Sequence, residues 1–280
     1  MIQRPSNSTR NRVIQTEKIS VLKFGGTSLS TEEGRSFAAS HVRTSIIRGF
    51  NPVVVVSAMG RYGDPYSTDT LISLAGTGNG LHPRDMDLLI SCGETISSVI
   101  FCSKLNALGL KAMPLTGGMA GIVTDSNFGN ASIVEIRKDR IMGVIRQGII
   151  PVVSGFQGST ENGEITTLGR GGSDTTAIAI ASELRADHVC IYKDVDGVMT
   201  CDPKKSTDAR FVDQISAARL LEMIDSGSRL MHRKALELAI SRGIAFRIRN
   251  TFPSSRETIV YPTDGNTPAA APCTDSSGIV

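Results

Sequence analysis

Lys23 and the glycines after it form the first of four segments whose residue types could do chemistry. The lysine lies at the end of an apolar run, and Gly25 and Gly26 follow Phe24 directly. Glycines let backbone amides approach an anion closely, and a helix that begins after them adds the positive end of its dipole. The lysine could then reach phosphate oxygens, although the Walker A spacing is absent. A Gly-Gly turn beside a solvated lysine would have the same residue pattern, so this segment alone does not establish a phosphate site.

A second segment places one arginine among glycines and an aspartate. Arg170 is surrounded by residues with small or acidic side chains, namely Gly169, Gly171, Gly172, Ser173 and Asp174. The guanidinium group presents a planar pair of donors that matches a carboxylate, and glycine neighbours would let a ligand lie against the backbone. Ser173 or Asp174 could simply cap the helix predicted from Thr175, but a cap needs only one residue. The combination therefore favours a binding site over a glycine-rich turn.

An acidic loop is predicted after the strand-like run that ends at Tyr192. It starts with Lys193-Asp194 and reaches Lys204 through an Asp-Pro pair. Ligands of parallel sheets bind at the carboxyl ends of strands, so this loop is placed to contact one. Its aspartates lack the spacing and the closing glutamate of an EF-hand, which argues against a calcium site.

Glu94 is the fourth feature, because it lies among apolar residues of a predicted helix, residues 85–108. A carboxylate in such surroundings is costly unless it is paired. Its partner is either an internal cation or a cationic group of a ligand, and the sequence leaves both possibilities open.

The elements that must position these residues alternate between strands and helices. The predicted strands are Ile19–Phe24, Pro52–Ser57, Lys111–Pro114, Ile149–Ser154, His188–Tyr192 and Ala245–Arg249. The predicted helices are Thr31–Arg48, Asp85–Leu108, Ala131–Gln147, Thr175–Leu184, Ala217–Ser226 and Arg233–Arg242. This alternation predicts an α/β protein whose mostly parallel sheet is covered by helices on both faces.

The composition is that of an ordinary soluble protein. The 280 residues are 40% hydrophobic and 20% charged, with a formal net charge of +3. This charge is too small and too dispersed to indicate a nucleic-acid surface. No apolar run approaches the roughly 20 residues of a membrane span. Five cysteines without a CxxC pair favour reduced thiols and a cytoplasmic protein. Residues 1–17 and 263–280 are predicted to be disordered tails.

The four segments, in this order, resemble aspartate kinases of the amino-acid kinase superfamily, above all those of Gram-positive bacilli. The matching phrases are KFGGTS (23–28), VVVVSAMG (53–60), SCGETISSVIF (91–101), GFQG (155–158), TLGRGGSDTTA (167–177) and DVDGVMTCDP (194–203). The resemblance implies a three-layer αβα sandwich with an open, mainly parallel sheet of about eight strands. It also implies transfer of a phosphoryl group from MgATP to the side-chain carboxylate of aspartate, and a kinase domain over residues 18–262.

The resemblance also implies a role for individual residues. Lys23, Asp174 and Arg229 would be catalytic. The substrate would contact Thr68, Glu94, Arg170, Gly171, Gly172, Ser173 and Asp174, with Glu94 at the α-amino group and Arg170 at the α-carboxylate. The nucleotide would contact Lys23, Gly25, Gly26, Ser57, Lys193, Asp194, Val198, Met199, Lys204 and Arg229. Mg²⁺ would be held mainly by the phosphates and water, without dedicated protein ligands.

Departures from the family pattern leave three hypotheses open. Relatives usually carry Thr at position 193, Arg at position 204 and Lys at position 229, whereas this chain has Lys193, Lys204 and Arg229. Arginine and lysine differ in reach and in donor geometry. The chain also stops where relatives continue into ACT-type regulatory domains, so no ACT domain and no feedback inhibition are expected. The chain is then an unregulated aspartate kinase, a kinase retuned to another carboxylate, or a binding protein without activity. A homodimer is possible.

Overall fold

The computed structural model describes residues 17–76, 80–201, 207–228 and 230–263. The two predicted tails fall almost entirely outside these ranges, as do Lys204 and Arg229. Two of the predicted nucleotide contacts therefore have no structural description here.

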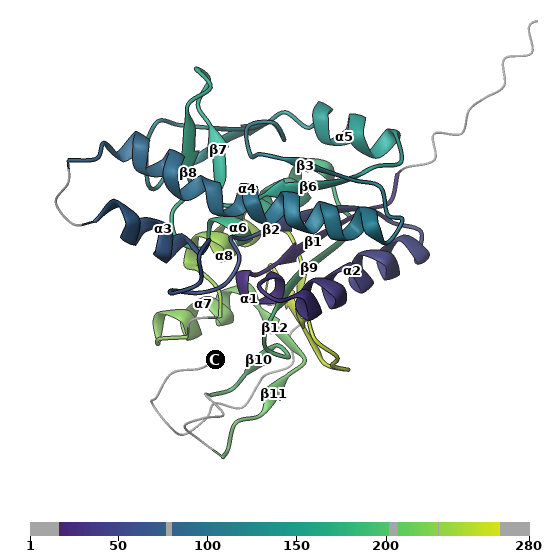
Figure 1. The fold of residues 1–280 in the computed structure, drawn as a ribbon. Coiled ribbons are helices and arrows are strands. Elements are labelled where there is room, and N and C mark those ends of the chain that lie inside the picture. Colours follow the sequence, from purple (N-terminus) through teal and green to yellow (C-terminus); the bar gives the residue numbers. More distant parts are fainter. Residues whose placement is uncertain (1–16, 77–79, 202–206, 229, 264–280) are drawn as a thin grey trace, which may run out of the picture.

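A central sheet of eight strands forms the middle layer of the protein (Figure 1). Its order is β12-β14-β13-β9-β1-β2-β6-β3. The strands are β1 (Ile19–Phe24), β2 (Asn51–Val56), β3 (Ala112–Leu115), β6 (Ile150–Ser154), β9 (His188–Lys193), β12 (Gln214–Ser216), β13 (Phe246–Asn250) and β14 (Glu257–Tyr261). Only the β13–β14 pairing is antiparallel, and every other pair in this sheet is parallel. The predicted open and mainly parallel eight-stranded sheet is thus confirmed.

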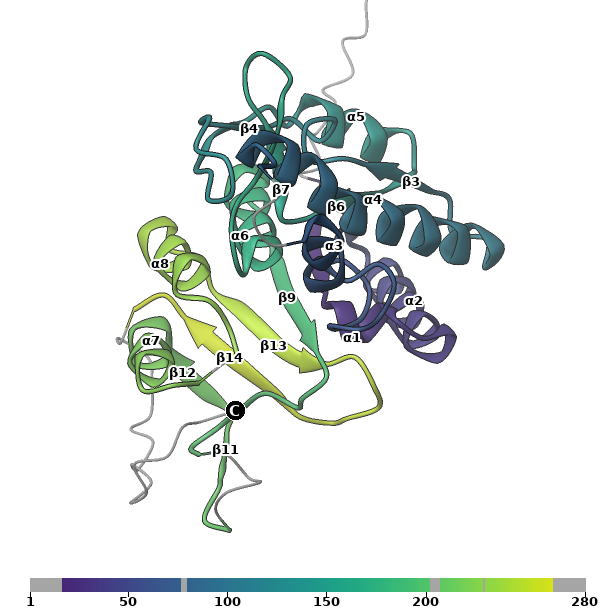
Figure 2. The ribbon, with the colours of Figure 1, turned by 60° about the vertical axis from the view of Figure 1, so that its left-hand side comes forward.

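Helices cover both faces of the sheet, as Figure 2 shows from a second side. One face packs against α2 (Glu32–Ile47) and α4 (Pro83–Ala107), next to the single turn α1 (Gly26–Leu29). The other face packs against α5 (Asp139–Arg146), α6 (Gly172–Leu184), α7 (Ala217–Asp225) and α8 (Arg233–Arg242). A short helix, α3 (Thr68–Ala75), lies on α4. The protein is therefore a three-layer αβα sandwich.

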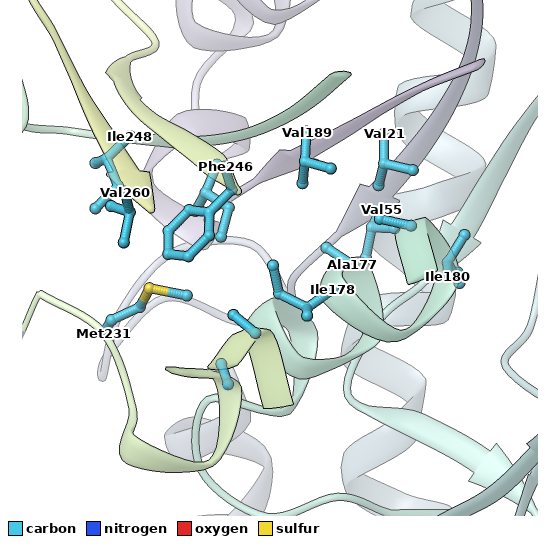
Figure 3. Close-up of a cluster of buried hydrophobic side chains, with 14 of the residues drawn as sticks. Val21, Val55, Ala177, Ile178, Ile180, Val189, Met231, Phe246, Ile248 and Val260 are labelled. Atoms are coloured by element: carbon cyan, nitrogen blue, oxygen red, sulfur yellow. The ribbon is translucent and has the colours of Figure 1, made fainter. Parts of the chain in front are cut away.

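Strand β1 packs against both helical layers, because its successive side chains point to opposite faces of the sheet. Val21 belongs to the cluster under α6 and α8, whereas Leu22 and Phe24 belong to the cluster under α2 and α4. Successive side chains of a strand point to opposite faces, so Lys23 faces the same side as Val21. Figure 3 shows Val21 and Val55 of neighbouring strands against Ala177 and Ile178 of α6. The fold thus directs the lysine toward α6.

Two smaller sheets consist of short strands that were not predicted from the sequence. A four-stranded sheet has the order β5-β4-β7-β8, and it consists of β5 (Ile133–Ile136), β4 (Ile122–Thr124), β7 (Gln157–Ser159) and β8 (Ile165–Thr167). A two-stranded ribbon joins β10 (Val198–Met199) to β11 (Phe211–Val212). The predicted helix over residues 131–147 is wrong in its first half, because residues 133–136 pair with β4 as a strand. Helix α5 begins only at Asp139.

Helix α4 is long and apolar enough, by length and composition alone, to cross a membrane. No other helix in the described part of the chain meets that test. Half of its most apolar stretch is buried, and its two buried carboxylates, Asp87 and Glu94, lie on the side that faces the protein. These are the features of the core helix of a folded domain. The expectation that no apolar run approaches the length of a membrane span therefore does not hold for α4.

Two helical glycines give opposite predictions for the same substitution. Gly143 of α5 has open space where a Cβ would lie, whereas a Cβ on Gly93 of α4 would lie 2.8 Å from the Ala58 Cβ and 2.9 Å from the Tyr66 carbonyl oxygen. Alanine is the better helix former, so Gly143→Ala should raise the free energy of unfolding by about 0.5–1 kcal/mol. Gly93→Ala should lower it by about 1–3 kcal/mol through overpacking. Urea denaturation of both variants checks this. A stabilised Gly93→Ala protein would contradict the packing described here.

Candidate active site

A pocket of about 680 Å³ opens at the carboxyl ends of β1, β2 and β9, where α3, α4 and α6 also meet. Most of the residues predicted for the site line it, although they come from distant parts of the sequence. They are Lys23, Gly26, Ser57, Thr68, Glu94, Arg170, Gly171, Gly172, Ser173, Asp174 and Lys193. The fold thus brings together the Lys23 segment, the Arg170 segment, Glu94 and the first residue of the acidic loop, Lys193.

Asp174 lies between two lysines and contacts both. Its Oδ1 is 2.7 Å from the Lys23 Nζ, and its Oδ2 accepts a hydrogen bond of 2.9 Å from the Lys193 Nζ. The lysines come from neighbouring parallel strands in which Lys23 is opposite Ile191. Lys193 is two residues further along β9 and therefore projects from the same face. Asp174 belongs to the first turn of α6, which packs across this face of β1.

Burial makes the charges of this cluster depend on one another. The side chains of Lys23 and Asp174 are only 6% and 5% exposed. Burial by itself would raise the pKa of Asp174, but the ammonium groups of Lys193 and Lys23 hold that pKa well below its usual range. Burial also lowers the pKa of Lys23, and Asp174 opposes this effect. The cluster therefore presents two lysine side chains and one ionised carboxylate to the pocket.

Glu94 has the opposite electrostatic character. It is 2% exposed, and its Oε1 accepts a hydrogen bond of 3.0 Å from the Ala58 backbone amide. Its Oε2 is buried without a hydrogen-bond partner among the described residues. Burial raises the pKa of this carboxyl to about 8. Glu94 is thus a buried carboxyl group in the pocket wall with one unpartnered oxygen, and a cationic ligand group beside it would favour its ionised form.

Glycines let the loops of the pocket lie closer together than side chains would allow. A Cβ on Gly26 would lie 2.4 Å from the Ala58 carbonyl oxygen, so the loops after β1 and β2 touch only because position 26 is glycine. Gly171 has φ of 74° and precedes α6, and a Cβ there would lie 2.3 Å from the Cβ of His232. The helix dipole expected after Gly26 comes only from the four-residue α1, because the longer helix begins at Glu32.

Arg170 reaches over the mouth of the pocket. Its side chain is 80% exposed, and its Nη2 is 3.8 Å from the Asp69 Oδ1 of α3. This contact is long for a charge-assisted hydrogen bond and is exposed to solvent, so it is weak. The guanidinium group therefore remains available to an incoming carboxylate.

Several pocket residues were not found from the sequence. Asp69 and His232 line the pocket, and so does Arg61, whose guanidinium lies 2.5 Å from the Asp194 carboxylate across the pocket mouth. Asp69 follows Ser67, which caps α3, and the Ser-Thr-Asp pattern of a helix start was available as a signal. His232 had no such signal, because its place opposite Gly171 depends on how α8 packs against α6.

The remaining predicted contacts lie outside the pocket lining. Gly25 is one residue away from it, and its amide donates to the Tyr192 carbonyl oxygen at 3.3 Å. Asp194 pairs with Arg61, Val198 is buried in the core, and Met199 pairs with Phe211 in the β10–β11 ribbon. Val198 could therefore offer a nucleotide only backbone atoms. Within the described ranges, no group of three or more His, Cys, Asp or Glu side chains could hold a metal ion.

Comparison with known proteins places this fold and pocket in a family. Residues 18–250 match the amino acid kinase family, to which the chain therefore belongs. Aspartokinase 1 of Bacillus subtilis is 43% identical over 244 residues, which cover 87% of this chain and 60% of that protein. The chain thus spans about 60% of the length of this relative.

Solved structures agree with this assignment. The aspartate kinase from Synechocystis is 36% identical with a TM-score of 0.75, and the match covers 92% of this chain and 41% of that one. Escherichia coli aspartokinase III in complex with aspartate and ADP is 26% identical with a TM-score of 0.74, over 87% of this chain and 64% of that one.

The raised pKa of Glu94 predicts a loss of stability as the pH rises. The folded protein retains the Glu94 proton up to a pKa of about 8, whereas the unfolded chain releases it near the ordinary value of 4.5. Between these values the folded state binds more protons, so its stability falls with increasing pH by up to about 1.4 kcal/mol per pH unit.

Glu94→Gln keeps the acceptor for the Ala58 amide and removes the titration. Its free energy of unfolding, relative to that of the unmodified protein, should therefore rise steadily from pH 5 to pH 8. Urea denaturation at several pH values measures this difference, and Glu33→Gln, on the exposed side of α2, is the matched control. A difference that does not change with pH would show that Glu94 titrates normally.

Proposed function

We propose that this chain is the catalytic domain of an aspartate kinase that transfers the γ-phosphoryl group of ATP to the side-chain carboxylate of aspartate. The observation that carries the proposal is the pairing, in one pocket, of an acceptor for an amino group with a cluster of buried cations. Glu94 is the acceptor, and Lys23 and Lys193 around Asp174 are the cations. The family and the three relatives support the same chemistry. Such an enzyme would act as a soluble protein of the cytoplasm.

Recognition of the substrate would use the charges at its amino-acid end. The α-ammonium group would favour the ionised form of Glu94, which would release its proton on binding; Oε2, which has no partner among the described residues, would then accept a hydrogen bond from that group. Arg170 would leave its long contact with Asp69 and bind the α-carboxylate through two parallel hydrogen bonds. Thr68 and the backbone of residues 171–173 would contact the rest of the substrate. This arrangement leaves the side-chain carboxylate to point toward Lys23.

Phosphoryl transfer would then depend on positioning and charge. The substrate carboxylate is ionised at neutral pH, so its oxygen attacks the γ-phosphorus without a general base. The bond from that phosphorus to the β,γ-bridging oxygen breaks, ADP leaves with this electron pair, and an acyl phosphate forms. Two anions must approach each other, and the ammonium groups that Lys23 and Lys193 would present to them would reduce their repulsion. Asp174 would hold both lysines in place during the reaction.

The nucleotide would lie across the ends of β1 and β9. The backbone around Gly25 and Gly26, the hydroxyl of Ser57 and the loop from Lys193 to Met199 would contact it, and Lys204 and Arg229 complete the predicted set. Mg²⁺ would enter with the phosphates and supply further charge neutralisation, with water completing its coordination. The donor set fits this assignment, because Asp174 is already engaged by two lysines and is no free ligand for a metal.

Turnover of aspartate is the direct test of the proposal. The purified protein, MgATP and hydroxylamine are incubated with a panel of amino acids and simple dicarboxylic acids, and any acyl phosphate is trapped as a hydroxamate. We expect hydroxamate with aspartate and little with glutamate, whose longer side chain would carry the reacting carboxylate past Lys23. A better substrate than aspartate would support a kinase retuned to another carboxylate. Nucleotide binding without turnover of any acid would overturn the proposal.

Variants of the two ends of the pocket should affect different kinetic constants. Arg170→Ala should raise the KM for aspartate by about 10–100-fold, because it removes a charged hydrogen-bonding group from the ground state and the transition state alike. Lys23→Met and Lys193→Met should each lower kcat, by about 100-fold or more for Lys23, because the charge they neutralise develops during transfer. Lys138→Met, on an exposed lysine paired with Glu183, is the matched control. If both pocket lysines could be replaced without loss of kcat, the proposed role of the cluster would be wrong.

A further inference from the structure

Helix α4 carries a second buried carboxylate that the proposed reaction does not use. Asp87 is 0% exposed and precedes Glu94 by seven residues. Seven residues are about two helical turns, or about 10 Å along the axis, so both carboxylates lie on the same side of α4. Asp87 was not among the residues singled out from the sequence.

Asp87 accepts three hydrogen bonds, all from residues that line the pocket. Its Oδ2 accepts from the backbone amides of Gly129 at 2.9 Å and Thr167 at 2.7 Å. Its Oδ1 accepts from the Thr167 hydroxyl at 2.7 Å. Hydrogen bonds to a buried carboxylate are strong, and this carboxylate repays its burial only while all three donors remain in place. Asp87 therefore ties two separate loops of the pocket wall to one helix.

Thr167 is the first anchor of the loop that carries Arg170. It is the last residue of β8, and its carbonyl oxygen also accepts from the Ala131 amide at 2.8 Å. Beyond it, Gly169 and Gly171 have φ of 76° and 74°, a conformation in which glycine has wide freedom. The side chain of Arg170 itself is 80% exposed and has only the long contact with Asp69. Leu168 is also held, since its amide donates to the Phe156 carbonyl oxygen at 2.8 Å and its own carbonyl oxygen accepts from the Lys234 Nζ at 3.1 Å. Thr167 and Leu168 together thus set the position from which the Arg170 loop starts.

We propose that Asp87 is a positioning residue that fixes the distance between Glu94 and Arg170. One rigid helix carries Glu94 directly and holds the root of the Arg170 loop through Asp87. In the proposed function, Glu94 binds the α-ammonium group of the substrate and Arg170 binds its α-carboxylate group. The inference rests on that assignment. Asp87 then determines how well a single α-amino acid can contact both groups at once, although it touches neither.

The test uses substitutions that weaken the hydrogen bonds of Asp87 and leave the side chains of Glu94 and Arg170 unchanged. Asp87→Asn replaces one acceptor oxygen by an amide that donates, and this amide would face a hydroxyl or a backbone N–H. Thr167→Val removes only the hydroxyl hydrogen bond, whereas Thr167→Ser keeps it. Asp85→Asn makes the same chemical change two residues earlier on the exposed side of α4, where Asp85 pairs with Arg84, and it is the matched control.

Steady-state kinetics should show a selective effect on the amino acid. We expect Asp87→Asn and Thr167→Val to raise the KM for aspartate by about tenfold, the equivalent of one charged hydrogen bond. The KM for ATP and kcat should change by less than about threefold, and Thr167→Ser and Asp85→Asn should match the unmodified protein. If Asp87→Asn fails to fold, the Thr167→Val and Thr167→Ser pair decides. A lower kcat together with a higher KM for both aspartate and ATP would show a merely structural role and overturn the inference.

Hydrogen exchange separates this inference from the proposed function. If the unmodified protein turns over no acid, the proposed function fails, and the inference is judged by amide exchange in residues 127–131 and 165–172. Faster exchange there in Asp87→Asn than in Asp85→Asn, at equal global stability, supports the positioning role. Equal exchange in the two variants overturns it.

Discussion

The contact of the Asp174 carboxylate with two buried lysines is the interaction on which the rest of the site depends. Lys23 and Lys193 project from adjacent strands into the layer under α6, where an unpaired ammonium group would be strongly destabilising. Asp174 can reach both only because α6 begins at Gly172 and crosses β1 at this point. The start of one helix and the register of two strands are therefore fixed together with the cation cluster. Removing the carboxylate would disturb both the fold and the charge of the pocket.

Helix α4 forms the opposite wall and contributes the carboxyl group of Glu94, whose ionised form a cationic ligand group would favour. It packs on the other face of the sheet, and its contact with the loop after β2 is close enough that position 93 must be glycine. This close contact brings the Ala58 amide to Glu94 and excludes water from the second carboxylate oxygen. The pocket thus lies where the two helical layers meet at the carboxyl ends of the strands, with cations on one side and a carboxyl group on the other. A zwitterionic ligand matches that separation of charge.

The proposed chemistry follows from this arrangement and not from the fold alone. A three-layer sandwich with ligands at its strand ends can serve many reactions. The buried acceptor on α4 and the exposed arginine before α6 favour an α-amino acid as the ligand. The lysine pair favours a transferring anion beside it. Asp87 connects the first two of these features, because α4 carries Glu94 and, through Asp87, also holds Thr167 before the loop of Arg170.

The sequence by itself determined the layers and most of the chemistry-bearing positions. Continuous apolar runs such as Val53–Val56 predicted buried central strands, and the structure confirms them, because a strand covered on both faces has no solvent side to mark. The Gly-rich segments with Lys23 and Arg170 could also be found, because the charged residue and its glycines are adjacent in the sequence. Only the tertiary structure decided that Lys193 shares Asp174 with Lys23, that residues 133–136 form a strand, and that Asp87 holds Thr167. Each depends on contacts between separate segments of the chain, and the periodicity within one segment carries no information about such contacts.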